Sequence, residues 1–559
     1  MESPVPTHSK DLITPEVGWV APFQAASGMD HLGLQVVAEQ IYSELLPGLT
    51  NVTDRLWNYA FYPWFAWAYQ QQGWESDDQS FKDALRRAEV LNTLIGAVHE
   101  LENGSDSFIH GGGLVGRQKL LGAAKDLISG SRFVLDDFAP LESTRQYFAN
   151  PRGGLGQYYQ SVLRNLGIMQ WDIKAGPQIS DSRGLLLAEA MDSHLDRAGF
   201  FTALQAASLN LQDIQNLSAF CPCQFHDMKG LRGHLEGMLL NKPESPFQEV
   251  VGEDRRKTLF LILASANHLN EPSNPEDIED HAYWRFREAM YSGAWNDHVS
   301  IEIPKAYERT RSCWRAFQRH ELFSIALQGV FWAGLYELSG GVGTIEDPDR
   351  YGRWFIERFS KVIRGIGKAK EPLQQALKTV ASHLPQVSQV EDDRHEMQLA
   401  YQLRTSAAAK DTEKTVHFAL RTLLALMARQ APPDPYENFE FQDGYFNSYP
   451  VNLHSLLGLN TAEMSLEAWI AYVVREWGIK AHLRVAFRKL YGEHLDTFKV
   501  IPEDDHLAIV SQEDIPRPNW TSPRLHNAIR MLLDLGLLER NLSISKRGRA
   551  LLVSEGLYG

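Results

Sequence analysis

The chain has 559 residues, of which 44% are hydrophobic and 22% are charged, and its formal net charge is −15 at pH 7. This length predicts three or four domains with sizeable cores, and the acidic balance excludes a surface that coats nucleic acid along its whole length, because phosphate binding needs clustered Lys and Arg. Only three Cys occur, so we expect no disulfide framework and a cytoplasmic, reducing location.

The N-terminus has no basic segment followed by an apolar one, so no secretory signal is expected. The first conspicuous segment, residues 46–74, contains four Trp but also Asn58, Pro63, three consecutive Gln and Gly73. These polar groups exclude a membrane span, and the scarcity of cations disfavours a base-stacking surface. We predict a buried helix that follows an N-cap at Thr53 and is kinked or split by Pro63, with inaccessible side chains at Trp57, Tyr62, Trp64 and Trp67. The alternative is a partner interface, where Trp and Tyr are enriched.

Helical periodicity dominates the rest of the chain. Apolar residues recur at spacings of three and four, which predicts helices over residues 29–45, 80–101, 256–264, 282–291, 312–338, 353–384 and 415–430. Alternating strands are rare, and the clearest pair is Thr497–Ile501 with Leu507–Val510, separated by a turn-like PEDD. Residues 431–450 are rich in Pro and aromatics and are expected to form an ordered surface loop.

The glycine-rich sequence IHGGGLVGRQK, from Ile109, is similar to a phosphate-binding loop. Gly116 is followed by Arg117-Gln118 in place of Lys-Ser/Thr, and no apolar strand precedes the loop. We therefore expect a turn before a helix, and no nucleoside triphosphate at Gly111–Gly116.

The sequence FCPCQFHDMKGLRGH contains a candidate zinc-ligand set: Cys221, Cys223, His226 and His234. Cys and His are the usual ligands of structural zinc, but the C-x-C spacing is tighter than usual and no second paired motif exists. The alternative is that these Cys are small buried apolar residues.

Two segments share a pattern. Residues 158–188 and 527–552 both run from a helix into Leu-Gly-apolar, a short hydrophilic stretch, Ile-Ser, Arg-Gly and a new helix. The first copy has Gly167 and Gly184 where the second has Gly536 and Gly548, and it holds five more residues between its two glycines. In the second copy we predict a helix over Ser522–Leu535 with an N-cap at Ser522 and a left-handed stop at Gly536, followed by a hairpin over Leu537–Ser545.

This pattern resembles the winged-helix family, over about 45 residues at the C-terminus and about 35 near residue 170. The resemblance implies a recognition helix and a wing, with DNA-facing positions at Arg524, His526, Asn527, Arg530, Lys546, Arg547 and Arg549. Residues 517–559 hold seven Lys/Arg and three Asp/Glu, whereas charges balance in the first copy. Duplex DNA is therefore a candidate partner of the C-terminal module, and a protein surface is the alternative.

The general look of LPGLTNVTDRLWNYAFYPWFAW and RGGLGQYYQSVLRNLGI resembles large bacterial proteins encoded in mobile defence islands. The resemblance implies an accessory or sensor role in antiphage defence beside separate ATPase or nuclease subunits. Two alternatives remain: a kleisin-like subunit of an SMC-type ATPase, and a metal-dependent nuclease or hydrolase. No sequence signature of an enzyme is complete.

These observations predict a mainly α, multi-domain protein with winged-helix modules that carry short β-hairpins, no membrane span, and no cofactor apart from a candidate structural zinc. The predicted domains are an aromatic-rich helical domain (1–150), a winged-helix-like module (151–200), a helical domain (201–430) and a C-terminal domain ending in a winged helix (431–559).

Overall fold

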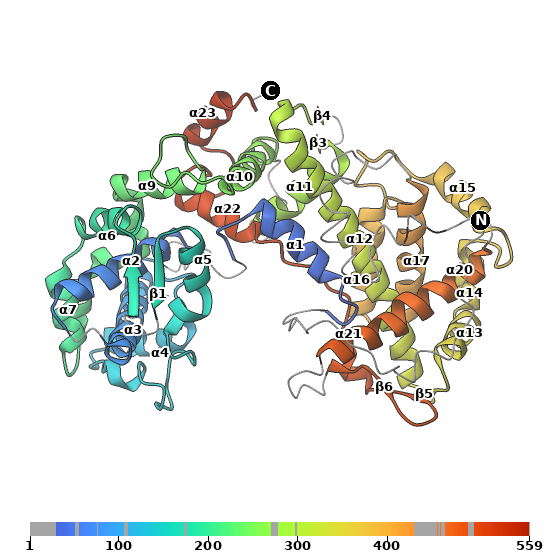
Figure 1. Cartoon of the computed structure of the whole chain (residues 1–559), viewed down its shortest axis with the longest axis horizontal. Coiled ribbons are helices and arrows are strands. Elements are labelled where there is room, and N and C mark those ends of the chain that lie inside the picture. Colours follow the sequence, from blue (N-terminus) through green and yellow to red (C-terminus); the bar gives the residue numbers. More distant parts are fainter. Residues whose placement is uncertain are drawn as a thin grey trace.

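The fold is an arch of helices with two lobes, and small sheets are its only strands among the described residues (Figure 1). The computed structural model describes residues 30–50, 55–74, 77–104, 110–172, 176–269, 278–296, 299–429, 456, 459, 464–489 and 497–557. The predicted mainly α class is confirmed. None of the described helices is long and apolar enough to cross a membrane.

The first lobe contains the aromatic segment. Its elements are α2 (Leu56–Gln71), α3 (Asp78–Asn103), α4 (Arg117–Ile128), η1 (Leu135–Asp137), η2 (Leu155–Tyr159), α5 (Gln160–Asn165), β1 (Met169–Asp172), β2 (Gly176–Ile179), α6 (Gly184–Asp192), α7 (Arg197–Gln205), α8 (Leu211–Gln215), η3 (Ser218–Phe220), η4 (Pro222–Asp227) and α9 (Lys229–Leu239).

The top of the arch joins this lobe to the second one (Figure 1). It consists of α1 (Gln35–Leu45), α10 (Gly252–Asn267), α11 (Ile278–Ser292), the strands β3 (Ala294–Asn296) and β4 (Val299–Ser300), α22 (Leu525–Asp534) and α23 (Lys546–Ser554). Apolar side chains of α1, α10, α11, α22 and α23 belong to the same buried cluster as those of the first lobe. The C-terminal segment therefore packs with the N-terminal part of the chain, so residues 525–557 share a core with residues 37–317.

The second lobe has its own core. It is formed by α12 (Lys305–Ser339), β5 (Thr344–Ile345), α13 (Pro348–Arg358), α14 (Ser360–Ile366), α15 (Leu373–His383), α16 (Glu396–Ala408), α17 (Thr412–Ala428), α20 (Leu466–Tyr472), η7 (Val473–Lys480), α21 (Ala481–Lys489), β6 (Val500–Pro502), β7 (Leu507–Ile509) and η9 (Gln512–Asp514). The predicted strand pair is confirmed as β6 and β7, which pair with Ile501 opposite Ala508, and β5 adds a third strand to β7.

The structure divides one of the helices that the periodicity predicts. The predicted helix over residues 353–384 is three helices, α13, α14 and α15. Phe359 separates the first two, and Gly367 and Pro372 cap the ends of the segment between α14 and α15. The predicted loop over residues 431–450 lies outside the described residues.

Helix α12 belongs to both lobes. Its first half places Trp314 and Phe317 in the first core, and its second half, from Leu322 onward, lies in the second core. Between Phe317 and Leu322 lie four consecutive polar residues that are all buried, Gln318, Arg319, His320 and Glu321.

These buried polar side chains are held by other elements. Arg287 of α11 donates from Nε to Gln318 Oε1 at 2.6 Å, and its Nη2 lies 3.4 Å from Glu321. Thr521 donates its backbone N–H and its hydroxyl to the same carboxylate. The junction of the two cores is thus a hydrogen-bonded polar layer, as buried polar groups require.

The aromatic segment forms one continuous helix, α2, that passes through Pro63 without a break. The predicted burial is confirmed for Trp57, Tyr62 and Trp64, whereas Trp67 is only partly buried, with Arg197 over its ring. The predicted N-cap, Thr53, lies outside the described residues. The alternative of an exposed aromatic groove is not supported, since these rings pack on the first core.

An acidic residue from the other end of the chain caps α2. Asp534 of α22 accepts hydrogen bonds from the backbone N–H of Leu56 at 3.1 Å and from Arg55 Nε at 3.3 Å. Asp534 and Arg55 are both buried. A carboxylate at a helix N-terminus satisfies a free N–H group and interacts favourably with the helix dipole. This contact joins residues that are 479 positions apart.

The two copies of the repeated pattern share their backbone contacts. Arg183 Nη1 donates to the carbonyl of Leu166 at 2.7 Å, and Arg547 Nη1 donates to the carbonyl of Leu535 at 2.7 Å. The hydroxyls of Ser180 and Ser545 donate to the carbonyls of Gly167 and Gly536, respectively.

The glycines of the two copies are also equivalent. Gly167 and Gly536 both have positive φ, 64° and 69°. A Cβ on Gly184 or on Gly548 would lie 2.3 Å from the carbonyl oxygen of Ile168 or Leu537, so only glycine fits at either place. The internal similarity therefore extends to local structure.

The C-terminal copy differs from its prediction in two details. Helix α22 begins at Leu525, because Arg524 adopts a left-handed conformation (φ 61°) and Ser522 is not the N-cap. The hairpin is reduced to one bridge, Leu538 with Ile544, whereas the first copy has two paired strands, β1 and β2.

We expect Trp64→Ala to lower the free energy of unfolding by about 3–5 kcal/mol, because it leaves a cavity and removes a buried ring. Trp64 is fully buried, and its Nε1 donates to Asp192 at 3.0 Å. Urea unfolding followed by circular dichroism measures the loss. Trp67→Ala, on the same helix but half-buried, is the matched control and should cost less. Equal losses would contradict the structural account of α2.

We expect Asp534→Ala to cost about 3–5 kcal/mol, since it removes a helix cap and leaves Arg55 buried without this carboxylate. Asp196→Ala removes the exposed side chain that caps α7 by accepting from Gly199, and should cost about 1 kcal/mol. Urea midpoints of the two variants test the difference, and an Asp534→Ala variant as stable as Asp196→Ala would show that the long-range cap contributes little.

Candidate metal centre

Four potential metal ligands meet at the end of α3. His99 lies in the last turns of α3, His110 lies in the loop before α4, Cys221 lies between η3 and η4, and Cys223 lies in η4. One donor atom of each lies within 4.8 Å of all the others. It is the one such group of three or more His, Cys, Asp or Glu among the described residues.

Three of the distances between donor atoms are close to those of a tetrahedral zinc site. The Nδ1 atoms of His99 and His110 are 3.1 Å apart, His110 Nδ1 is 3.4 Å from Cys221 Sγ, and His99 Nδ1 is 3.4 Å from Cys223 Sγ. With Zn–N of about 2.0–2.1 Å and Zn–S of about 2.3 Å, tetrahedral ligands lie roughly 3.3–3.8 Å apart. The donor types and spacing therefore fit one Zn²⁺ with two His and two Cys ligands.

The loop that carries His110 is fixed from two sides. Arg117 donates to the buried carboxylate of Glu100, at 2.9 Å from its Nε. Glu100 follows His99 directly, so this ion pair ties the start of α4 to the end of α3. A Cβ on Gly96 would lie 3.3 Å from Gly111 Cα, so the loop packs directly on the α3 backbone.

The carbonyls of this glycine-rich loop face the protein. Arg55 Nη1 donates to Gly112 O at 2.9 Å, and Thr93 Oγ1 donates to Val115 O at 3.0 Å. A phosphate loop presents backbone N–H groups to its ligand. In this loop, hydrogen bonds to backbone carbonyls hold a candidate metal ligand in position.

The two thiols have different electrostatic surroundings. A hydrogen bond from Cys221 and the proximity of His99 lower the pKa of Cys223 to about 5, against the effect of burial. The same hydrogen bond, together with burial, raises the pKa of Cys221. A thiolate is the form in which Cys binds a metal.

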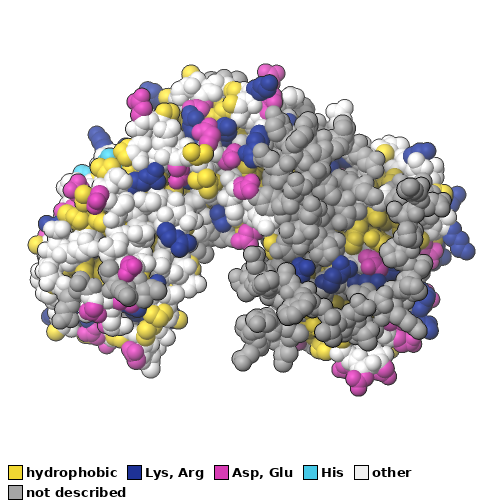
Figure 2. Space-filling view, in the orientation of Figure 1, with side chains coloured by type: hydrophobic (Ala, Val, Ile, Leu, Met, Phe, Trp, Pro, Cys, Tyr) yellow, Lys and Arg dark blue, Asp and Glu magenta, His cyan; other side chains and the backbone are white. Residues whose placement is uncertain are grey.

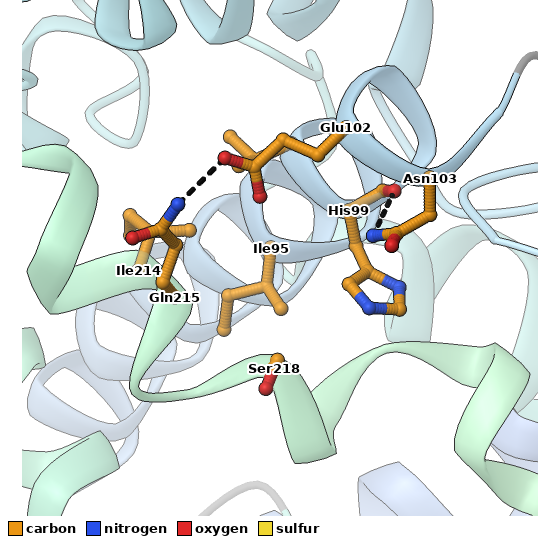
Figure 3. Close-up of a pocket in the computed structure, with 8 residues that line it drawn as sticks. Ile95, His99, Glu102, Asn103, Ile214, Gln215 and Ser218 are labelled. Carbon is orange, nitrogen blue, oxygen red and sulfur yellow. Dashed lines mark hydrogen bonds between the residues drawn. The ribbon is translucent and has the colours of Figure 1, made fainter.

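A pocket of about 220 Å³ borders the centre on the side of His99 (Figure 3). Its walls come from α3, α8 and η3, and Gln215 Nε2 donates across it to Glu102 Oε1 at 2.6 Å. Asn103 donates to the carbonyl of His99 at 3.0 Å and completes the last turn of α3. His99 is the member of the four-residue group that lines this pocket.

The structure brings together half of the ligand set that the sequence suggested. Cys221 and Cys223 belong to the group, but His226 and His234 do not. His226 is exposed on η4, because this short helix turns its side chain away from α3, and His234 packs on the ring of Phe247. The two His of the group lie more than 100 residues before the Cys pair, a separation that no local spacing motif contains.

At least five of the seven residues proposed to face DNA contact other parts of the chain. Arg530 pairs with Glu279 at 3.0 Å, and Arg547 pairs with Glu236. The others are Arg524, which lies over the ring of Tyr42, His526, which stacks on Tyr283, and Asn527, which donates to Thr50 O. Lys546 and Arg549 are exposed on α23.

No protein-family model, curated protein or solved structure matches the chain.

Proposed function

We propose that this chain is a zinc-containing, non-enzymatic scaffold that works as a component of a larger protein assembly. The observation that carries the proposal is the group of His99, His110, Cys221 and Cys223, whose donor atoms all lie within 4.8 Å of one another. Four protein ligands fill the coordination sphere of Zn²⁺, whereas a catalytic zinc keeps a position open for water or substrate. The metal would supply cross-linking, not Lewis-acid chemistry.

The location supports a structural role. The four ligands come from three segments that are distant in sequence, and the metal would fasten the end of α3, the loop before α4 and the turn between η3 and η4. Such a cross-link stabilises the folded state by binding it and not the unfolded chain. The first lobe would thereby present a fixed surface to a partner.

An assembly role also accounts for the C-terminal module better than direct DNA reading. Arg530 and Arg547 are used inside the chain, so their charge serves internal contacts. Protein subunits such as an ATPase or a nuclease are the proposed partners, and the accessory role in antiphage defence remains a prediction from resemblance. Duplex DNA is the second candidate partner, favoured by exposed Lys546 and Arg549 on a segment with an excess of basic residues.

We expect the purified chain to contain about one zinc per molecule, measured by inductively coupled plasma mass spectrometry. Cys221→Ser with Cys223→Ser should lose the metal, because the thiolate ligands are removed. His226→Ala with His234→Ala is the matched control, from the same segment and outside the group, and should keep it. A strong chelator should lower the melting temperature of the parent chain but not that of the Cys double variant.

Two results would overturn the assignment of these ligands. One is a parent chain without zinc after purification in metal-supplemented medium. The other is zinc that persists in the Cys double variant and disappears from the His226/His234 variant. His99→Ala provides a further check, since it should weaken zinc binding without removing a thiol.

For DNA, we expect weak binding that falls with salt and depends on the exposed cations. Lys546→Ala with Arg549→Ala should reduce any log–log salt slope by about two, roughly 0.9 for each phosphate contact. Arg530→Ala with Arg547→Ala should mainly lower stability, because it leaves Glu236 buried without this partner. If the Arg530→Ala, Arg547→Ala variant folds stably but loses DNA affinity, the C-terminal module binds DNA. That result would contradict the proposal that this module serves protein assembly.

A further inference from the structure

A second pocket lies in the other lobe, far in sequence from the metal ligands. It has a volume of about 280 Å³ and is walled by α14, α15, α16 and α17. Its apolar walls include Ile366, Val380, Leu384, Leu399 and Ala425. Its polar lining is basic, with His383 from α15, Arg394 from the loop before α16, and His417 and Arg421 from α17.

Arg421 lines this pocket without a carboxylate partner among the described residues. Several other arginines of the lobe pair with carboxylates, for example Arg358 with Glu337 and Glu413, and Arg475 with Asp349 and Glu476. Arg421 is half-buried, and its side chain makes no ion pair or hydrogen bond with another described residue. Burial and the nearby charge of Arg394 both lower its pKa, which is what an unneutralised guanidinium experiences.

The neighbouring histidines add positive charge only in their protonated forms. Burial and the charge of Arg421 lower the pKa of His417, and no carboxylate acts in the opposite direction. His383 Nδ1 lies 2.8 Å from the carbonyl of Thr379 and donates to it, so Nε2 can donate to a phosphate oxygen when the ring is protonated.

One acidic group lies at the edge. Asp392 binds Arg394 through Nε at 2.9 Å and Nη2 at 2.6 Å, so it is neutralised by a single arginine. This contact uses one side of the guanidinium and fixes it beside the pocket. Helix α14 contributes only Gly365 and Ile366 to the lining. The charge balance of the lining is therefore positive.

We propose that this pocket binds the phosphate group of a small phosphorylated molecule, with Arg421 as its main anchor, Arg394, His383 and His417 around it, and the apolar walls holding the organic part. A guanidinium presents paired N–H groups that match phosphate oxygens. A mononucleotide-sized phosphomonoester suits the small volume. The proposal is independent of the metal centre, which lies in the first lobe.

The probes are inorganic phosphate, sulfate, adenosine 5′-monophosphate and uncharged adenosine, each titrated into the full chain by calorimetry. Phosphate and the monophosphate should bind and raise the melting temperature, and adenosine alone should not. Arg421→Gln should weaken phosphate binding roughly tenfold to hundredfold through loss of charged hydrogen bonds. Arg404→Gln, an exposed arginine of α16 outside the pocket, is the matched control and should bind like the parent.

The organic part is tested by comparing the two phosphates. Tighter binding of the monophosphate identifies a phosphorylated small molecule, and equal affinity identifies free phosphate as the source of the same anion. Absence of binding by every anion overturns the proposal. So does equal binding by Arg421→Gln and the parent, provided that the variant keeps its melting temperature without ligand.

A pH series separates the histidines from the arginines. Sulfate keeps its charge over this range, so its affinity should rise as the pH falls from about 7 to about 5, because the pKa of His417 lies below its usual value of 6.5 and its ring becomes protonated there. His417→Gln should flatten this rise without abolishing binding. A rise that is identical in His417→Gln would remove His417 from the proposed site.

Discussion

The contact between Asp534 and the start of α2 is the constraint on which the rest of the first lobe depends. The carboxylate holds the backbone N–H of Leu56 and the side chain of Arg55. Arg55 in turn donates to Gly112 O, two residues from His110. One buried ion pair thus connects the C-terminal segment, the aromatic helix and the loop that carries a candidate metal ligand. Because an unpaired buried charge is costly, the three parts are fixed together.

The repeated motif adds a second constraint on the same lobe. The arginine that closes each copy also reaches the segment around the end of α9: Arg183 donates to the carbonyls of Pro246 and Gln248, and Arg547 pairs with Glu236. Two similar local structures, about 360 residues apart in sequence, therefore hold one stretch of chain between them. Both arginines bind other parts of the same chain, which explains why basic residues in a winged-helix-like pattern need not face a nucleic acid.

The parts of the structure that the sequence predicted are those that depend on residues close together in the chain. The 3.6-residue period located α3, α12 and α17, and alternation located the β6–β7 pair. Gly536 adopts the left-handed conformation expected after a helix. The misses involve long-range contacts. The start of α22 is set by Arg524, which packs on Tyr42, and the metal ligands His99 and His110 are brought to the Cys pair only by folding. A short stretch of sequence does not contain both partners of such a contact, so a local pattern does not predict it.

Helix α12 has a consequence for how the molecule loses its structure. It is 35 residues long, or roughly 52 Å at 1.5 Å per residue, and each half packs in a different core. The polar layer at its middle, including Glu321, joins it to Arg287 and Thr521. If one lobe unfolded, half of this helix would lose its tertiary contacts. The buried ion pair at the middle of the helix would then be destabilised. We therefore expect the two lobes to be thermodynamically coupled, so that they melt cooperatively although each has its own core.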